Sequence, residues 1–300
     1  MNLLDLFQRY QDNDVAIAYL ESIRWKDGVM CPYCNSNKTC KHHVKDRKKK
    51  WQCWNCKHSF SVTVGTIFHH THIDLNKWFW LISLMLNAKK RLSACQAARD
   101  LGMRRPTVWS MMHRIRKAMA TDQAALLQGI VEMDECYVGG KPRKGDYDDD
   151  DKPKRGRGTK KIPVVGIVER EGEVRIESAK KIKLTSKNLM ELVRKYVDPK
   201  KSLLMTDEYA GYKPMNKLLP HSTINHCYEY VRGTIHTNTI ESFWAILKRG
   251  IIGQFHKVSE PYLQNYLYEF EYRHNRRKQH SQSIFEETLG RMVCVNEIYN

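Results

Sequence analysis

The sequence predicts a chain that combines a small metal-stabilised module, a helical region and a C-terminal α/β domain. Two closely spaced cysteine pairs near the N-terminus indicate the metal-stabilised module. Amphipathic periodicity between residues 62 and 121 indicates the helical region, and short apolar runs that alternate with helical patterns after residue 128 indicate the α/β domain. The 300 residues suffice for one large domain or for two to three smaller ones.

The balance of charges predicts an anionic polymer as the partner. The chain carries 51 Lys and Arg against 33 Asp and Glu, a formal net charge of +18. Because Lys and Arg displace the counterions of phosphates, we expect nucleic acid, although a solvated basic surface would give the same balance. No run of about 18 apolar residues predicts a membrane span. The N-terminus lacks the pattern of a signal peptide, so we expect a cytoplasmic protein without membrane contact.

The two cysteine pairs predict one structural Zn²⁺ bound by Cys31, Cys34, Cys53 and Cys56. Each pair has the form Cys-x-x-Cys, and 18 residues separate the pairs. This spacing is typical of four-thiolate zinc sites, and an intracellular setting favours metal over disulfides. A cluster of free thiols is the alternative. The nearby side chains that could substitute as ligands are Cys40, His42, His43 and His58.

A basic hairpin is predicted between the two pairs, from residue 38 to residue 51. Its cations include Lys48 and Lys49, which we expect to contact DNA phosphates; a merely solvated hairpin is the alternative. Residues 2–25 predict one or two short amphipathic helices, the second capped by Asn13 or Asp14. We therefore place an N-terminal helical segment at 1–27 and a zinc ribbon at 28–62.

Residues 63–127 are predicted to form a helix-turn-helix-like DNA-binding region. After an apolar helix at 75–87, a second helix ends at Leu101-Gly102 and a basic helix follows from 103 to 117. Two helices joined by a short turn with glycine are the pattern of a helix-turn-helix unit. The side chains expected to pack inward are Val108, Met111, Met112 and Ile115. Those expected to contact DNA are Arg104, Arg105, Thr107, Ser110 and Arg114.

Residues 128–290 are predicted to form one α/β domain. Strands are expected at 130–138, 162–168, 173–178, 203–207 and 223–227, and helices at 186–197, 238–249 and 259–276. The polar stretch 141–161 is expected to be a flexible charged loop. This succession of elements is that of a ribonuclease-H-like domain, in which acids on the first strand, after the fourth strand and on a late helix gather. Asp134, Asp207 and Glu241 occupy these positions.

Glu241 and Lys248 are seven residues apart on one predicted helix, so both project from nearly the same face, with Trp244 between them. Three carboxylates arranged in this way are what a two-metal phosphodiester site needs. A surface salt bridge of Glu241 with Lys248 or Arg249 is the alternative. Glutamates follow both aspartates, and adjacent strand residues point to opposite faces, so the strand pattern leaves open which acid of each pair faces the metals.

Seven segments together resemble a known family, and they span most of the chain. The sequence resembles the zinc-ribbon DDE transposases of bacterial insertion sequences, the group related to Merlin elements. The matching segments are Cys31-Pro-Tyr-Cys34 with Cys53-Trp-Asn-Cys56, Met133-Asp-Glu-Cys-Tyr-Val-Gly-Gly-Lys141, Pro163-Val-Val-Gly-Ile-Val-Glu-Arg170, Thr206-Asp-Glu-Tyr-Ala-Gly-Tyr212, His236-Thr-Asn-Thr-Ile-Glu-Ser-Phe-Trp-Ala-Ile-Leu-Lys-Arg-Gly250 and Leu267-Tyr-Glu-Phe-Glu-Tyr-Arg-His-Asn-Arg276.

The resemblance implies an enzyme that binds terminal inverted repeats, cuts DNA at the ends of its element and joins the 3′-hydroxyls to target DNA. It implies that Asp134, Asp207 and Glu241 hold two Mg²⁺, for which Mn²⁺ would substitute, with Lys248 beside them. Some relatives have Asn as the third residue, and Asn238 stands nearby; we favour Glu241 because a carboxylate holds a hard cation better than an amide does.

The implied partner is double-stranded DNA, on which at least a homodimer assembles in association with the bacterial nucleoid, and Arg249 is a further expected contact to it. A DNA-binding regulator with a decayed core and a stand-alone nuclease of the same fold are the alternatives. A second metal cluster of Cys136, His226 and Cys227 competes with simple strand packing of these residues. His236 and His256 are candidates for phosphate contact.

Overall fold

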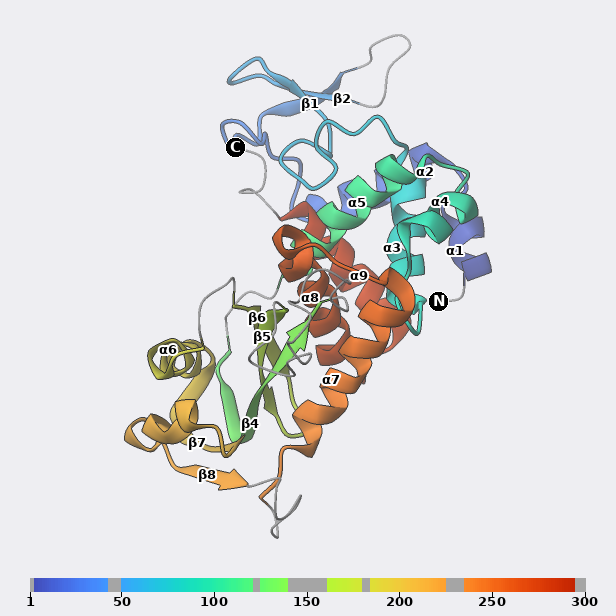
Figure 1. Ribbon diagram of the computed structural model, residues 1–300. Coiled ribbons are helices and arrows are strands. Elements are labelled where there is room, and N and C mark those ends of the chain that lie inside the picture. Colours follow the sequence, from blue (N-terminus) through green and yellow to red (C-terminus); the bar gives the residue numbers. More distant parts are fainter. Residues whose placement is uncertain are drawn as a thin grey trace. The chain divides into compact units, whose positions relative to one another are not determined.

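The computed structural model describes residues 3–42, 50–120, 125–139, 161–179, 184–224 and 235–294 (Figure 1). The chain forms two compact units, one of residues 1–119 with 279–300 and one of residues 120–278. No helix in the described ranges is both long enough and apolar enough to cross a membrane. The predicted positions that lie outside the described residues are His43, Lys48, Lys49, His226, Cys227 and the loop from 141 to 160.

The first unit combines a small sheet with helices. Strands β1 (Thr39–His42), β2 (Lys50–Cys53) and β3 (Ser59–Phe60) pair antiparallel in the order β1-β2-β3. The helices are α1 (Leu3–Arg9), α2 (Asn13–Arg24), α3 (Leu75–Asn87), α4 (Ala94–Asp100), α5 (Arg105–Ala118) and α9 (Ser281–Val293). Asp12 caps α2 by accepting the backbone N–H of Val15 at 3.3 Å, one residue before the predicted cap.

Helix α9 belongs to this first unit, although the sequence predicted a single domain from 128 to 290. Phe285 of α9 lies edge-on to Phe79 of α3, with ring centroids 6.0 Å apart, and also contacts Tyr10. Leu289 is fully buried. Contacts between residues about two hundred positions apart leave no periodic signal in the sequence, so the packing of α9 on the first unit could not be predicted. The domain limits given above remain predictions.

Helices α4 and α5 form the two arms of the predicted helix-turn-helix. Ser93 caps α4 by accepting the backbone N–H of Gln96 at 3.2 Å. Gly102 takes a left-handed φ of +60°, which a side chain would disfavour, and so allows the sharp turn between the helices. The four apolar side chains predicted to pack inward are all buried: Val108, Met111, Met112 and Ile115.

The second unit is built on a five-stranded sheet in the order β6-β5-β4-β7-β8. The strands are β4 (Leu127–Val138), β5 (Ile162–Glu169), β6 (Val174–Ser178), β7 (Val197–Asp207) and β8 (His221–Ile224). Strand β5 runs antiparallel to both neighbours, whereas β7 and β8 run parallel to β4. Counted in chain order, this is the 3-2-1-4-5 arrangement of a ribonuclease-H-like domain, as predicted.

Helices cover both faces of this sheet (Figure 1). Helix α6 (Ser186–Tyr196) and the 3₁₀ segment η2 (Ala210–Lys217) pack on one face, where Met133 of β4 contributes to the core. Helices α7 (Asn238–Gly250) and α8 (Glu260–Asn275) pack on the other, where Cys136 of β4 lies. A short π-helical turn, η3 (Ile251–Phe255), continues α7. Alternate residues of β4 therefore face opposite helical layers.

Gly166 of β5 lets α7 approach the sheet closely. A Cβ atom at this position would lie 2.6 Å from Cη2 of Trp244 and 2.9 Å from Cδ1 of Ile240. Both of these side chains are buried on α7. The absence of a side chain at residue 166 is therefore a condition for the depth at which α7 sits.

We expect Gly166→Ala to lower the free energy of unfolding by about 1–3 kcal/mol, because the added methyl group must displace a buried indole ring. Urea denaturation followed by circular dichroism measures this change. Gly253→Ala is the matched control, since a Cβ there meets no atom within 4 Å. Equal stability of the two variants would contradict the close approach.

Candidate functional site

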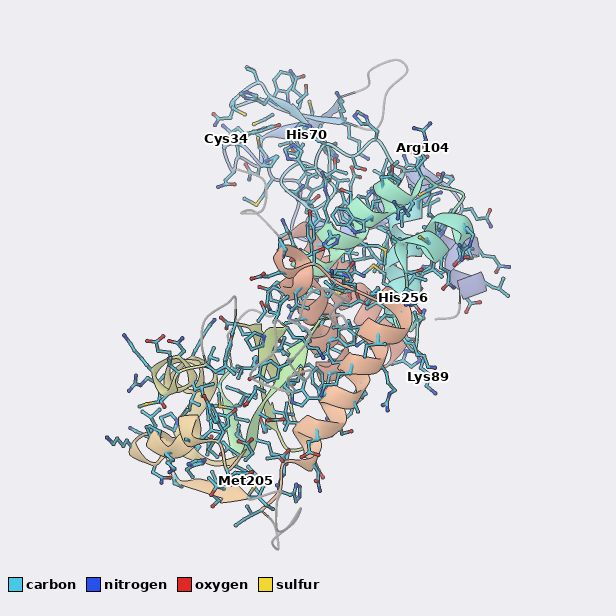
Figure 2. The ribbon with its side chains drawn as sticks, viewed as in Figure 1. Cys34, His70, Lys89, Arg104, Met205 and His256 are labelled. Carbon is cyan, nitrogen blue, oxygen red and sulfur yellow. The ribbon has the colours of Figure 1, made fainter. Side chains whose placement is uncertain are left out.

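The four predicted cysteines converge at one point of the first unit, where Figure 2 labels Cys34. The sulfur of Cys31 lies 3.6 Å from that of Cys56, and the sulfur of Cys34 lies 3.6 Å from that of Cys53. All four sulfurs are within 4.8 Å of one another. A zinc ion with Zn–S bonds of about 2.3 Å implies sulfur separations of roughly 3.8 Å, so this thiol set fits zinc.

Both cysteine knuckles have the same backbone shape. The N–H of Asn35 donates to the carbonyl of Cys31 at 2.9 Å, and the N–H of Lys57 donates to that of Cys53 at 3.0 Å. Asn35 and Lys57 adopt left-handed φ values of 54° and 61°. A hydrogen bond from the backbone of Ser36 lowers the pKa of the Cys34 thiol to about 6, which favours the thiolate that zinc binds.

Asp134 lies within β4, and Asp207 is the last residue of the parallel strand β7. The β4–β7 pairing runs as far as Glu132 and Met205, two residues before each aspartate, and the charge of Asp207 acts on Asp134. The indole Nε1 of Trp244 on α7 donates to Oδ2 of Asp134 at 2.9 Å. The backbone N–H of Tyr209 donates to Oδ1 of Asp207 at 3.0 Å.

The two acids in sequence on β4 face opposite sides of the sheet. Asp134 faces Trp244 of α7, whereas Glu135 accepts a 2.7 Å hydrogen bond from the hydroxyl of Tyr212 in η2. The strand pattern alone had left the choice between Asp134 and Glu135 open. Asp134 is the acid on the side of α7.

The surroundings of Asp134 favour its neutral form in the absence of a cation. Burial first, and then the negative charges of Glu135 and Asp207, raise the pKa of Asp134 from 3.8 to about 7, although hydrogen bonds from the backbone and from Trp244 lower it. Carboxylates that repel one another in a partly buried site are a donor set suited to a hard divalent cation. The residues therefore fit the metal that the resemblance implies.

Glu241 lies exposed in the first turn of α7, where Thr237 donates a hydrogen bond to its Oε1 at 3.0 Å. Within the described residues, the four cysteines are the one set of three or more potential ligands whose atoms all lie within 4.8 Å. The carboxylates of Asp134, Asp207 and Glu241 are thus not all gathered at that distance. Their joint role remains a prediction, and Asn238 is exposed one turn earlier on the same helix.

Lys248 lies near the face of β4 that carries Asp134. Burial raises the pKa of the Cys136 thiol on that strand to about 12, and the positive charge of Lys248 opposes this rise. Lys248 and Arg249 are both exposed in the last turn of α7. Cys136 is buried in the core between the sheet and α7, which accords with packing.

The side chains predicted to contact DNA differ in their surroundings. Arg104 and Arg105 are exposed at the start of α5, where Figure 2 labels Arg104, and Thr107 is half-buried in the first turn of the same helix. Arg114 instead donates from Nη1 to the carbonyls of Ile67 and His69, at 3.2 and 3.0 Å. Its guanidinium thus holds the segment between β3 and α3.

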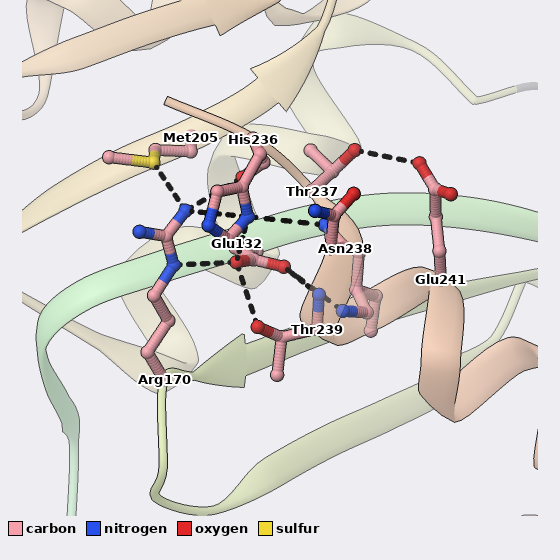
Figure 3. Close-up of polar contacts among 9 residues, drawn as sticks. Glu132, Arg170, Met205, His236, Thr237, Asn238, Thr239 and Glu241 are labelled. Atoms are coloured by element: carbon pink, nitrogen blue, oxygen red, sulfur yellow. Dashed lines mark hydrogen bonds and ion pairs between the residues drawn. The ribbon is translucent and has the colours of Figure 1, made fainter. Parts of the chain in front are cut away.

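Glu132 was not among the predicted site residues, yet it is fully buried two positions before Asp134. It accepts hydrogen bonds from the backbone N–H groups of Thr239 and Ile240, at 2.8 and 3.0 Å, and from Arg170 Nε at 2.7 Å (Figure 3). An acid inside an apolar strand was the signal that could have found it, because a buried charge requires partners.

Two parts of the chain match known protein families. Residues 126–275, half of the chain, match the ISXO2-like transposase domain. The chain belongs to the ISXO2-like transposase family. Residues 11–59 of this transposase match the transposase zinc-ribbon domain, which contains all four cysteines of the cluster. The predicted family and the structural zinc site are thereby confirmed.

One relative and two solved structures are similar to this transposase. An uncharacterized protein in transposable element ISH50 of Halobacterium salinarum is 28% identical over 265 residues, 85% of this chain and 88% of that protein. The Mos1 strand transfer complex is 10% identical, with 73% and 78% of the chains covered and a TM-score of 0.29. The Mos1 paired-end complex with left transposon end is 14% identical, with 72% and 79% covered and a TM-score of 0.30. These scores are too low to show a shared fold, which the strand order gives by itself.

We expect one zinc ion per chain by elemental mass spectrometry. Cys53→Ser should lose this zinc and make the zinc-ribbon residues sensitive to protease, since a structural zinc site contributes directly to folding. Cys95→Ser is the matched control, because Cys95 is exposed on α4 outside the cluster. Full zinc content in Cys53→Ser would contradict the assignment.

We expect Asp134→Asn to stabilise the zinc-loaded protein when Mg²⁺ and Mn²⁺ are absent. The folded protein, with a pKa near 7 for Asp134, holds a proton that the unfolded chain, with a pKa near 3.8, releases. The contribution of Asp134 to stability is therefore present below pH 4 and lost as the pH rises through 7. The advantage of the variant should grow over this interval to at most roughly 4 kcal/mol.

Denaturant unfolding at pH 4, 5.5, 7 and 8 measures this difference. Glu191→Gln, on the exposed side of α6, is a control that should follow the wild-type curve. Parallel curves for wild type and Asp134→Asn would contradict the raised pKa.

Proposed function

We propose that this transposase binds the terminal inverted repeats of its insertion sequence, hydrolyses phosphodiesters at the ends and joins the freed 3′-hydroxyls to target DNA. The observation that carries the proposal is the pair of neighbouring carboxylates, Asp134 within β4 and Asp207 at the end of β7, with Trp244 of α7 bonded to Asp134. The raised pKa of Asp134 supports a site that is completed by cations.

Asp134, Asp207 and Glu241 are the residues that would hold two Mg²⁺, with Mn²⁺ as a substitute. Such ions, when bound, polarise the scissile phosphate and make a water or hydroxyl group more acidic. Trp244 keeps Asp134 in one orientation through its N–H. Glu241 would exchange its hydrogen bond to Thr237 for a cation, and Asn238 lies close enough in sequence to assist. Lys248 would neutralise a phosphate beside the sheet.

The proposed reaction has two steps and needs no external energy source. In the first step water attacks a phosphorus atom, the bond from phosphorus to the 3′-oxygen breaks, and the element ends in a 3′-hydroxyl. In the second step this hydroxyl loses its proton and attacks a target phosphorus, and the displaced target 3′-oxygen takes up a proton. The first step hydrolyses one phosphodiester, the second breaks one and forms one, and no covalent enzyme intermediate is needed.

Binding of the DNA ends is proposed for the basic residues of the first unit and of α7. Arg104, Arg105 and Thr107 lie at the start of the second helix of the helix-turn-helix, the position from which such helices contact bases. Lys48, Lys49 and Arg249 would contact phosphates. Arg114 is also a candidate, with a smaller expected effect because two backbone carbonyls already accept from it. Since two ends are joined, at least a dimer is expected on DNA.

Strand-transfer assays with duplexes that carry the element's inverted repeats, a target plasmid and Mg²⁺ test the proposal. Joined products indicate a transposase, cut products alone a nuclease, and binding alone a regulator. We expect Asp134→Asn, Asp207→Asn and Glu241→Gln each to reduce cutting and joining by about a thousandfold or more, because each removes a charge that stabilises the transition state. All three should bind the ends as tightly as wild type.

Glu191→Gln, on the exposed side of α6, should keep both activities. Full strand transfer by Asp134→Asn would refute the assignment of the metal site. Full activity of Glu241→Gln together with loss in Asn238→Ala would move the third role to Asn238.

A further inference from the structure

Glu132 acts as the missing cap of helix α7. The first N–H groups of a helix have no partner within it and require an acceptor from elsewhere. The residue at the cap position, Thr237, makes no capping hydrogen bond to the helix backbone. Instead Oε2 of Glu132 accepts from the N–H groups of Thr239 and Ile240, at 2.8 and 3.0 Å, and Oε1 accepts from the Thr239 hydroxyl at 2.9 Å (Figure 3). A side chain of β4 thus begins α7.

Arg170, directly after β5, balances the charge of Glu132 and extends the contacts to β7. Its Nε donates to Oε1 of Glu132 at 2.7 Å. Its Nη2 donates to the carbonyl of His236 at 2.9 Å and to Nδ1 of the same residue at 3.0 Å. The same nitrogen lies 3.0 Å from the sulfur of Met205, two residues before Asp207 on β7. One guanidinium therefore contacts β4, β7 and the residue that leads into α7.

The same contacts continue to Glu241. Arg170 fixes His236, and the next residue, Thr237, donates its hydroxyl hydrogen bond to Glu241 (Figure 3). The three elements that bear the proposed metal-binding acids are β4 with Asp134, β7 with Asp207 and α7 with Glu241. All three meet at the pair formed by Glu132 and Arg170.

The burial of this pair favours a geometric role over a purely stabilising one. The Glu132 side chain is fully buried and that of Arg170 is 17% exposed. A buried ion pair seldom stabilises a protein more than well-packed apolar side chains would, because both charges lose their hydration. A charged pair at this junction therefore fixes the relative orientation of the elements, because the carboxylate accepts from defined N–H groups and the planar guanidinium donates in fixed directions.

We propose that Glu132 and Arg170 are positioning residues, which hold β4, β7 and α7 in the relative placement that lets Asp134, Asp207 and Glu241 share divalent cations. This inference rests on the proposed function. Neither residue needs to touch the metal or the DNA, because both act through the elements that carry the acids. Partners that orient metal ligands typically change metal affinity by about 10–100-fold when they are replaced.

Glu132→Gln tests the proposal, since it keeps the size of the side chain and removes its charge. Glu271→Gln is the matched control: Glu271 of α8 is also buried, accepts the N–H of Ile176 at 3.1 Å and lies 3.9 Å from an arginine, Arg175. Both variants therefore lose a buried glutamate charge beside an arginine, but only Glu132 caps α7.

The first measurement is hydrogen exchange of the amides of Thr239 and Ile240 in zinc-loaded protein without DNA. We expect exchange about tenfold faster in Glu132→Gln and unchanged in Glu271→Gln, because only the first variant weakens the acceptor. The second is Mn²⁺ binding by electron paramagnetic resonance, in which Glu132→Gln should bind about tenfold more weakly than wild type.

The third measurement is the Mg²⁺ concentration that gives half-maximal strand transfer. We expect it to rise about tenfold in Glu132→Gln, with most activity recovered in Mn²⁺. Mg²⁺ demands near-ideal octahedral ligands, whereas Mn²⁺ binds such sites more tightly. Displacement of the carboxylates should therefore weaken the binding of Mg²⁺ more than that of Mn²⁺. General loss of folded protein would lower activity in both metals alike.

Wild-type amide exchange and wild-type metal dependence in Glu132→Gln would overturn the positioning role. If that variant fails to fold, Arg170→Lys replaces it, since the charge remains and the planar fork is lost; the same shifts in smaller size support the proposal, and wild-type values overturn it. Equal Mn²⁺ binding by wild type and Asp134→Asn would instead contradict the proposed function, while leaving the exchange result on the cap intact.

Discussion

Strand β4 presents two carboxylates to the same helix, and the second unit is arranged around their charges. Glu132 and Asp134 are two residues apart on one strand, so both face α7. A carboxylate in an apolar layer must be protonated, paired with an opposite charge or hydrogen-bonded. The protein satisfies Glu132 with an arginine and the first N–H groups of α7. It buries Asp134 near the acids Glu135 and Asp207, so that its pKa rises although the indole N–H of Trp244 lowers it.

This contrast separates a charge that holds the fold, Glu132, from the one that we propose to bind cations, Asp134, on a single strand. Glu132 fixes where α7 begins, and Gly166 on the next strand sets how closely α7 lies on the sheet. Trp244 of α7 then reaches Asp134. The zinc ribbon differs, because four soft thiolates fill the tetrahedral coordination of zinc and leave no open position. The thiolates of the zinc ribbon and the carboxylates proposed to bind Mg²⁺ thus belong to separate compact units.

Local patterns in the sequence predicted the parts whose causes are local. The cysteine spacing predicted the zinc ligands, apolar runs predicted the strands, and the turn at Gly102 predicted the paired helices. The partners of Glu132 could not be predicted, because Arg170 and Thr239 reach it from distant positions in the chain. Helix α9 was missed as part of the first unit for the same reason. Strand alternation alone does not show that Asp134 faces α7 and Glu135 faces the other side. That assignment also requires the register of the sheet.

Asp134, Asp207 and Glu241 are proposed to surround one pair of cations, and this arrangement can be mapped directly. Fe²⁺ can replace Mg²⁺ among oxygen ligands, and with ascorbate and peroxide it generates radicals that cut the nearest backbone. Mass spectrometry of the zinc-loaded protein then maps the cuts. We expect them around Asp134 in β4, at the end of β7 and in the first turn of α7, suppressed by excess Mg²⁺ and absent in Asp134→Asn. Cuts that avoid these three segments, or that persist in Asp134→Asn, would contradict the account.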